Sequence, residues 1–317
     1  MSVLLTEAQV EALLSMPDAI GAVQEGFRLL ARGEAQNFPR QRGGPPGAVL
    51  NVMWAVAPEI GLMAVKSYPV VRIDVPQSST STLVLYGLPD GRVRGVLQAD
   101  TLGQRRSGAA SAVATGLMAR PDSQVLTLFG AGWQAGGQVE ALAHVLPALS
   151  RVLIVNRDTK RGRKFAAEVE ETLGIPAEPT DAESGVRQAD VIVTATGASD
   201  PLFDGAWVRP GTHINAVGSN YREKAEIDAA ALASAAMVAA DSVEVARLEC
   251  GDLHRARFDW ETVVELGDIV VGNRPGRQSE EDVTIFESQG LAIEDLVCGD
   301  VVLREAESRG EGVEIPI

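Results

Sequence analysis

The sequence predicts an α/β protein in which one domain holds a doubly wound parallel sheet and a second, discontinuous α+β domain is built from both chain ends. Three observations support this prediction. The 317 residues suit two domains of about 150 residues each. Strand-like and helical stretches alternate after Pro121, and the glycine-rich segment 130–136 follows the first of these strand-like runs.

The composition is that of a globular protein, with 45% hydrophobic and 22% charged residues. The formal net charge of -15 opposes nonspecific attraction to nucleic acid and to anionic membranes. The predicted partner is therefore a small molecule, with no nucleic-acid or membrane partner.

Cysteine usage and the N-terminus bear on the compartment. Cys250 and Cys298 are too few for a disulfide framework, and no Cys/His cluster has zinc-site spacing, so no metal is expected. Residues 1–7 lack a basic stretch followed by an apolar run, and no uninterrupted stretch of about 18 apolar residues occurs. We therefore expect a cytoplasmic protein.

The first third of the chain changes from helical to strand-like patterning. Thr6 and Gln9 form a capping-box pattern that opens a helix, and a second helix with apolar residues at helical spacing ends at Gly33. From Ala48 to Leu97, short apolar runs broken by Gly and Pro predict a sheet.

A helix of small residues is expected from Arg105 to Met118, and Pro121-Asp122 marks a break after it. An apolar helical stretch is expected from Asp282 to Leu303, and it would return to the first domain. We therefore expect a substrate-binding and dimerisation domain from residues 1–119 with 286–317, and a dinucleotide-binding domain from residues 120–285.

The glycine-rich turn predicts a Rossmann dinucleotide site, because it directly follows an apolar strand and opens a helix. Gly130 permits the tight turn, Gly132 lets the backbone approach the pyrophosphate, and Ala135 or Gly136 allows close packing of helix and strand. Trp133 and Gln134 complete the motif at the helix N-terminus, whose N–H groups face the phosphates.

The end of the second strand indicates which cofactor binds. There, after Asn156, the chain has Arg157 in place of the carboxylate that holds the ribose 2′-hydroxyl of NAD. An arginine pairs with a 2′-phosphate, which favours NADP. Asp158 lies next to it and keeps NAD as the alternative.

Three cationic residues of the first domain are candidates for substrate binding. Lys66 lies in an apolar segment, where its ammonium is partly desolvated unless it meets a ligand. Arg106 is expected at the start of the small-residue helix, where it could hold an anion together with the helix N-terminus. Arg40 is a further candidate, although Arg42 is equally well placed; a snorkelling lysine and surface ion pairs are the structural alternatives.

With these motifs in place, the chain resembles the ornithine cyclodeaminase/mu-crystallin family over its whole length. Five ordered segments carry the resemblance: Val65-Lys66, 106–112, 130–135, 213–218 and 284–295. The resemblance implies a homodimer and substrates that are amino acids or their imino or keto counterparts. It also implies that Arg40, Lys66 and Arg106 surround the substrate carboxylate, and that the cofactor is bordered by Thr194, Ala195, Thr196, Val217 and Ser219.

One departure from the family's sequence pattern bears on the choice between a reductase and a cyclodeaminase. Cyclodeaminases and archaeal alanine dehydrogenases of the family have an aspartate where this chain has Asn220, and an amide cannot accept a proton as a carboxylate does. Glu226 and Asp228 are the candidate replacements for that carboxylate. We therefore expect an NAD(P)H-dependent reductase of α-imino acids, reversibly an amino-acid dehydrogenase, with Lys66, Arg106, Arg40 and Asn220 at the catalytic site. A redox-neutral cyclodeaminase and a non-catalytic NADP-binding protein are the alternatives.

Overall fold

The computed structural model describes residues 2–71 and 81–316. The chain divides into two compact units. The first unit contains Met1–Arg106 and Leu291–Ile317, and the second contains Ser107–Gly290. The first boundary therefore lies earlier in the chain than the expected 119/120, and the second lies later than the expected 285/286.

The first unit is an α+β domain with a seven-stranded sheet in the order β15-β1-β6-β5-β4-β3-β2. Neighbouring strands are antiparallel except β1 and β6, which are parallel. Its elements are β1 (Ser2–Leu5), α1 (Glu7–Leu13), α2 (Met16–Ala31), β2 (Gln36–Gly43), β3 (Ala48–Ala57), β4 (Leu62–Val71), β5 (Thr82–Gly87), β6 (Val93–Gln98), the first part of α3 (Asp100–Met118), α11 (Ala292–Arg309) and β15 (Val313–Ile315). The sheet expected over 48–97 is confirmed, except that positions 72–80 lie outside the described residues.

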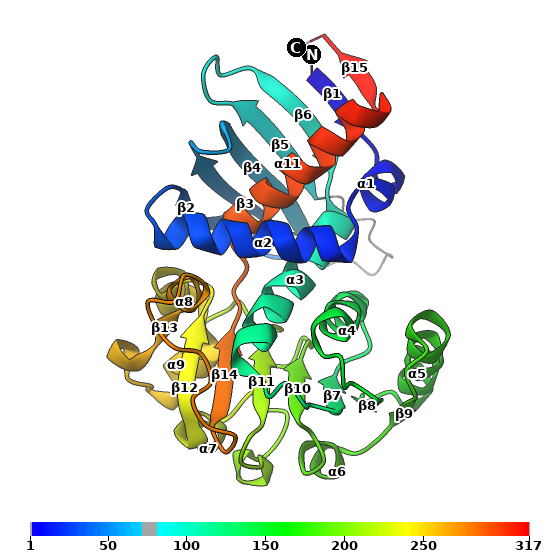
Figure 1. Ribbon diagram of the computed structural model, residues 1–317, viewed down its shortest axis with the longest axis vertical. Coiled ribbons are helices and arrows are strands. Elements are labelled where there is room, and N and C mark those ends of the chain that lie inside the picture. The colour runs from blue at the N-terminus through cyan, green and yellow to red at the C-terminus, as the bar shows by residue number, and fades with distance from the viewer. Residues whose placement is uncertain (1, 72–80, 317) are drawn as a thin grey trace. The chain divides into compact units, whose positions relative to one another are not determined.

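Helix α11 lies across one face of this sheet, and α2 packs along α11 (Figure 1). The two helices approach closely at Gly26, where a Cβ atom would lie 3.4 Å from Val297. The expected capping box at Thr6 and Gln9 is present, and Gly33 has the left-handed φ of 70° that was expected after the second helix. The C-terminal helix thus lies directly against the strands that carry the candidate substrate residues.

The second unit has the Rossmann fold, with an eight-stranded parallel sheet in the order β13-β12-β14-β11-β10-β7-β8-β9. Its strands are β7 (Val125–Phe129), β8 (Arg151–Val155), β9 (Ala177–Pro179), β10 (Val191–Thr194), β11 (His213–Ala216), β12 (Ala235–Ala240), β13 (Val264–Glu265) and β14 (Val283–Glu287). Its helices, besides the rest of α3, are α4 (Trp133–Val145), α5 (Thr159–Leu173), α6 (Ala182–Val186), α7 (Ala229–Ser234), α8 (Val243–Glu249), α9 (Gly251–Ala256) and α10 (Leu266–Val270), with the short 3₁₀ turns η1 (Gly205–Trp207) and η2 (Trp260–Thr262).

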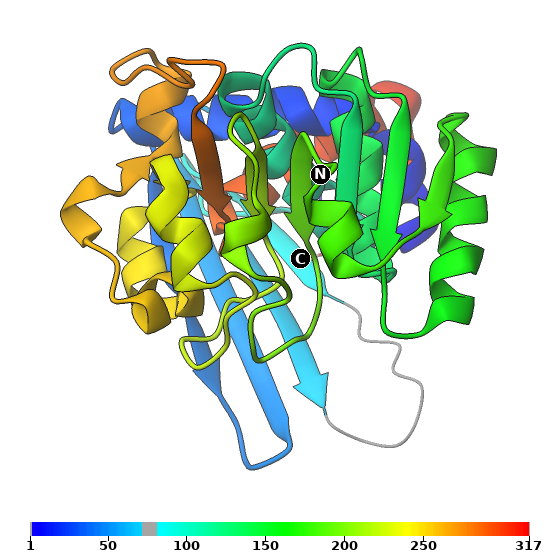
Figure 2. The same cartoon turned by 90° about the horizontal axis from the view of Figure 1, so that it is seen from below.

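Helices cover both faces of this parallel sheet (Figure 2). Strand β10 shows the alternation: Val191 and Val193 pack into the core formed with α4 and α5, whereas Ile192 packs into the core on the opposite face. Because both faces are buried, the strands are almost continuously apolar.

Two sequence expectations about helices are wrong. Residues 283–287 form strand β14 between β11 and β12, and the helix begins only at Ala292. A short apolar run that is buried on both sides has no polar alternation to distinguish a strand from a helix. Helix α3 begins at Asp100, so Arg106 lies within it and not at its N-terminus.

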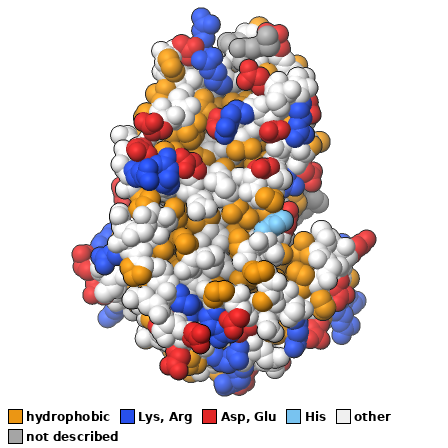
Figure 3. Space-filling model, in the orientation of Figure 1, with side chains coloured by type: hydrophobic (Ala, Val, Ile, Leu, Met, Phe, Trp, Pro, Cys, Tyr) orange, Lys and Arg blue, Asp and Glu red, His pale blue; other side chains and the backbone are white. Residues whose placement is uncertain are grey.

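Within the described residues, no helix combines the length and apolar character needed to cross a membrane. Figure 3 shows Lys and Arg side chains interspersed with Asp and Glu side chains on the drawn face. The negative net charge is therefore not gathered into one acidic patch on that face.

Candidate active site

Lys66 occupies a buried position on β4 in the first unit. It follows Leu62 and Ala64 on the face of the strand that packs against α11, and it is only 4% exposed. Its Nζ atom lies 2.7 Å from Oδ1 of Asp295, in the first turn of α11. The ammonium therefore meets a carboxylate of its own chain, and Lys66 is not a snorkelling edge lysine.

Arg106 joins the same group from α3. Its Nη1 atom lies 2.7 Å from Oε2 of Glu294, and its Nε atom lies 3.3 Å from Oδ1 of Asp295. Helix α3 also passes close to the lysine at Gly103, where a Cβ atom would lie 2.8 Å from Nζ of Lys66. The glycine thus leaves room for the ammonium, and the arginine forms a buried ion pair and not a surface one.

Arg40 and Arg42 lie on the same strand but in different surroundings. Arg40 is buried, and its positive charge acts on Lys66. Arg42 is half-buried and donates a hydrogen bond from Nε to Oδ1 of Asn51 at 3.1 Å. Of the two, Arg40 is the residue whose charge acts on the lysine.

We call Lys66, Arg106, Arg40, Glu294 and Asp295 the cationic cluster. It contains three cationic side chains and two carboxylates, with ion pairs between Lys66 and Asp295 and between Arg106 and Glu294. Burial lowers the pKa of Lys66 below its usual value of 10.5, and the positive charges of Arg106 and Arg40 act in the same direction, while Asp295 opposes them. The cluster can therefore accept an anion and offers an ammonium that is a stronger acid than a solvated lysine.

The residues missed by sequence reasoning are Glu294 and Asp295. They fall in the tail segment that carries the family resemblance, but two acidic residues in the first turn of a helix are also favoured by the helix dipole. Charge balance was the signal that could have revealed these two carboxylates, because three cations in apolar surroundings require buried carboxylate partners.

The glycine-rich turn of the second unit fits a dinucleotide. Gly130 has a φ of +114°, and a Cβ atom there would lie 2.5 Å from the carbonyl oxygen of Ala195, so a side chain is excluded. Gly132 is the N-cap of α4, and a Cβ atom there would meet no atom closer than 3.6 Å. The backbone at Gly132 is thus open to a pyrophosphate, Ala135 is fully buried behind it, and Trp133 is 59% exposed at the start of the helix.

The end of β8 leads directly into α5. Arg157 is exposed there, and the side chain of Asn156 donates a hydrogen bond to the backbone oxygen of Asp158 at 2.8 Å. The carboxylate of Asp158 accepts the N–H groups of Lys160 and Arg161 as the N-cap of α5. Oδ1 of Asp158 therefore serves the helix.

Glu226 joins the loops that follow β10 and β11. Its Oε1 accepts hydrogen bonds from the backbone N–H of Thr196, at 2.9 Å, and from the Thr196 hydroxyl, and its Oε2 accepts the N–H of Gly218 at 2.9 Å. Burial raises the pKa of this carboxyl, and the bonds to Thr196 and Thr194 oppose the rise. Both of its oxygens are engaged in holding the segments that contain Thr194, Ala195, Thr196, Val217 and Ser219.

The loop after β11 also holds the remaining expected site residues. The Ser219 hydroxyl is buried and bonds to the backbone oxygens of Tyr221 and Lys224, and Asn220 is half-buried beside it. The carboxylate of Asp228 serves as the N-cap of α7. Glu226 and Asp228, the two candidate replacements for the missing aspartate, are therefore both engaged in hydrogen bonds within the unit.

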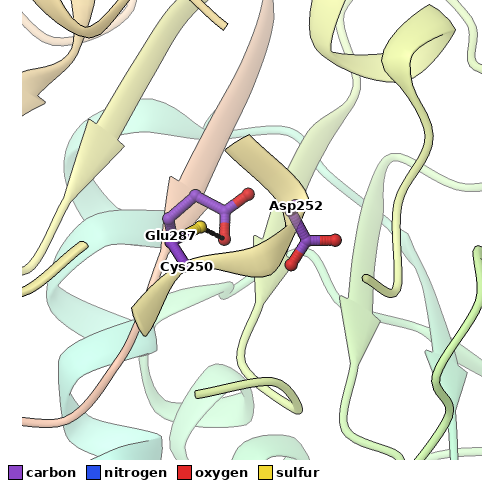
Figure 4. A group of neighbouring side chains, drawn as sticks. All are labelled: Cys250, Asp252 and Glu287. Atoms are coloured by element: carbon purple, nitrogen blue, oxygen red, sulfur yellow. Dashed lines mark hydrogen bonds between the residues drawn. The ribbon is translucent and has the colours of Figure 1, made fainter. Parts of the chain in front are cut away.

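A second buried group in the same unit consists of Cys250, Asp252 and Glu287, which we call the acidic cluster (Figure 4). Its donor atoms lie within 4.8 Å of one another, a spacing that could hold a metal ion. The thiol of Cys250 bonds to Oε2 of Glu287 at 3.3 Å, and Oδ1 of Asp252 accepts the backbone N–H groups of Glu226 and Ile227.

The acidic cluster holds titratable groups whose burial opposes ionisation. Burial raises the pKa of Cys250 well above its usual 9.0, and burial together with the charge of Asp252 raises the pKa of Glu287 well above 4.5. Metal ligation requires a deprotonated thiol and carboxylate. The absence of a metal stays a prediction.

Comparison with known proteins agrees with this geometry. A model of the ornithine cyclodeaminase/mu-crystallin family matches residues 1–310. An alanine dehydrogenase from Archaeoglobus fulgidus is 34% identical over 325 residues, which cover 99% of this chain and 98% of that enzyme.

Two solved structures share the fold over nearly their whole length. One is the Delta(1)-pyrroline-2-carboxylate reductase of Thermococcus litoralis in complex with NADH and L-proline, with a TM-score of 0.94 at 29% identity, covering 99% of this chain and 100% of that chain. The other is an archaeal alanine dehydrogenase dimer with bound NAD, with a TM-score of 0.93 at 32% identity, covering 99% of each chain.

Proposed function

Because the chain belongs to the ornithine cyclodeaminase/mu-crystallin family, we propose that it is an NAD(P)H-dependent reductase of α-imino acids that also runs in reverse as an amino-acid dehydrogenase. It is an oxidoreductase acting on C–N bonds, like the alanine dehydrogenase and the pyrroline-2-carboxylate reductase it resembles. The observation that carries the proposal is the buried lysine of the cationic cluster, which lies among two buried arginines and two buried carboxylates.

Arg106 and Arg40 bind the substrate carboxylate in this proposal. A guanidinium matches the two oxygens of a carboxylate, and the cluster offers two of them. Glu294 and Asp295 hold Arg106 in one orientation, at 2.7 and 3.3 Å. The substrate is thereby fixed by a group whose own position is set by the first turn of α11.

Lys66 gives the proton to the imine nitrogen. Its lowered pKa brings the ammonium nearer to the pH at which a general acid is most effective. Oδ2 of Asp295 is buried and has no hydrogen-bond partner among residues 2–71 and 81–316, so it is the acceptor for a substrate N–H group. When bound, the nicotinamide supplies the hydride that reduces the C=N carbon.

The cofactor is held by the turn 130–136, with Asn156 and Arg157 toward the adenosine ribose. We propose a preference for NADP, supported by the exposed Arg157 and by the engagement of Asp158 as a helix cap. The two solved relatives have NADH or NAD bound, so NAD is the alternative. A homodimer, as in the archaeal alanine dehydrogenase, and a cytoplasmic location, supported by the free thiols of Cys250 and Cys298, complete the proposal.

Cyclodeamination is the rival reaction, and the carboxylates of the second unit argue against it. The δ-amine of ornithine is protonated near neutral pH and needs a base before it attacks. The family supplies an aspartate where this chain has Asn220, while Glu226 and Asp228 are bonded to backbone N–H groups. Reduction of an imine makes no such demand.

The test is to supply cyclic and acyclic α-imino acids with NADPH or NADH and to follow the absorbance of the reduced cofactor. We expect continuous oxidation of the cofactor and formation of the amino acid. Conversion of ornithine to proline and ammonia without net cofactor oxidation would instead identify a cyclodeaminase. Tight cofactor binding without either reaction would identify a binding protein.

A further inference from the structure

Arg161, in the first turn of α5, reaches back to the phosphate turn of the Rossmann domain. Its Nε atom donates a hydrogen bond to the backbone oxygen of Ala131 at 2.9 Å. Its Nη2 atom lies 3.6 Å from the position that a Cβ atom of Gly132 would occupy. The guanidinium therefore lies beside the glycine at which the backbone is open to a cofactor.

The Arg161 guanidinium is held by a hydrogen bond at Nε, and its two terminal nitrogens are left for a ligand. The backbone N–H of Arg161 is bound by the carboxylate of Asp158 at 3.1 Å, and Nε is bound by Ala131. Within the described part of the chain, Nη1 and Nη2 make no hydrogen bond or ion pair, and the side chain is exposed. The arrangement presents the N–H groups of a pre-oriented cation beside the turn, with no carboxylate to neutralise it.

We infer that Arg161 is a second specificity residue for the cofactor, which binds the 2′-phosphate of NADP together with Arg157. This inference rests on the proposed binding of a nicotinamide dinucleotide. The adenosine ribose of a Rossmann cofactor lies at the end of the second strand, where Arg157 is located, and the pyrophosphate lies on the helix N-terminus. Arg161 lies in the first turn of α5, close to the end of β8, and so approaches the turn from the ribose side.

The positive charge of the two arginines favours the 2′-phosphate of NADP over the ribose 2′-hydroxyl of NAD. A phosphate accepts charge-assisted hydrogen bonds from two arginines, whereas a ribose hydroxyl gains little from a guanidinium. The nearby acidic group, Asp158, uses its Oδ1 atom for the first turn of α5.

The experiment compares Arg161→Gln and Arg161→Lys with the matched control Arg163→Gln, an exposed arginine on the same helix. Binding of NADPH, NADH, adenosine 2′,5′-bisphosphate and ADP is measured by calorimetry on the full chain. We expect Arg161→Gln to weaken NADPH and the 2′,5′-bisphosphate by about ten- to a hundredfold and to leave NADH and ADP unchanged. Arg161→Lys should recover part of the loss, and Arg163→Gln should change nothing.

Two results would overturn the inference. Equal weakening of all four ligands by Arg161→Gln would place the arginine at the pyrophosphate or in the structure of the turn, and no weakening of any would remove it from the site. These results differ from a failure of the proposed function. A protein that binds no dinucleotide at all would refute cofactor use itself, while selective loss of the 2′-phosphate in a protein without reductase activity would uphold Arg161 and refute the reaction.

Discussion

The cationic cluster of the first unit and the acidic cluster of the second both bury titratable side chains, yet they differ in charge. The cationic cluster holds two short ion pairs, Lys66–Asp295 and Arg106–Glu294, each at 2.7 Å, and the charge of Arg40 also acts on Lys66. The acidic cluster contains no cation, and its thiol and carboxyl groups have raised pKa values.

The difference shows that burial of a titratable group does not by itself mark a catalytic site. In the acidic cluster, Asp252 holds the Glu226 segment and Glu287 accepts from Cys250, while Oε1 of Glu287 is buried and has no hydrogen-bond partner within the described residues. In the cationic cluster the carboxylates are paired with Lys66 and Arg106, and Oδ2 of Asp295 likewise has no hydrogen-bond partner within the described residues. The clusters therefore differ in the presence of cations, and the cationic cluster is the one suited to an anionic substrate.

The largest expected effect is on turnover when Lys66 is changed to Met. Loss of a positioned proton donor lowers the rate by about 10² to 10⁴. Cofactor affinity should not change, because the turn 130–136 belongs to the other unit. Steady-state kinetics and a cofactor titration measure both quantities.

Lys164→Met is the matched control, since this lysine is exposed and pairs only with Glu168 on the surface of α5. It should leave turnover unchanged. Normal turnover in Lys66→Met would make the cationic cluster a structural group like the acidic one, and the comparison between the two would fail.

The next effect follows from Asp295→Asn, which keeps the shape of the side chain and removes its charge. The carboxylate raises the pKa of Lys66, so its loss lowers that pKa further. The rate of imine reduction should then decline with rising pH at a lower pH than in the wild type, because Lys66 loses its proton earlier. The free energy of unfolding should fall by about 1.5 to 3 kcal/mol, as for other hydrogen bonds to charged groups.

Lys66→Arg keeps the positive charge, but a guanidinium does not release its proton near neutral pH, so turnover should fall as it does in Lys66→Met. An unchanged pH profile in Asp295→Asn would show that Lys66 does not provide the proton. Denaturant unfolding, measured on the same proteins, separates this result from a general loss of structure.

Much of the second unit could be predicted from the sequence because its signals are local. A strand, a glycine-rich turn and a helix follow one another over 125–145, and the structure has each of them at that place. Strand β14 could not be predicted, since a run that is apolar on both faces lacks the periodicity that separates strands from helices.

The cationic cluster could be predicted only in part because its members are distant in sequence. The sequence indicates Lys66 and Arg106 as candidate substrate-binding residues. Their partners lie on α11, about 190 to 230 residues further along the chain. Nothing local distinguishes Asp295 from an ordinary acidic residue at a helix N-terminus. Pairing across that separation depends on the packing of α11 on the sheet, which patterns within a segment do not encode.

The smallest expected effect tests the acidic cluster through Glu287→Gln. The pKa of Glu287 is raised in the folded protein, so its contribution to stability is fully present below its usual value of 4.5 and is lost as pH rises through the folded pKa. The amide resembles the protonated carboxyl in shape and still accepts from Cys250, but it cannot ionise. At pH 4.5 the two proteins should therefore differ in unfolding free energy by less than about 1 kcal/mol.

As pH rises, the wild type should lose stability relative to Glu287→Gln, whereas Glu171→Gln on the exposed face of α5 should run parallel to the wild type. Denaturant unfolding at several pH values measures the slopes. Parallel curves for wild type and Glu287→Gln would mean that Glu287 is ionised in the folded protein, and the acidic cluster would then need a cation, such as the metal ion its spacing could hold.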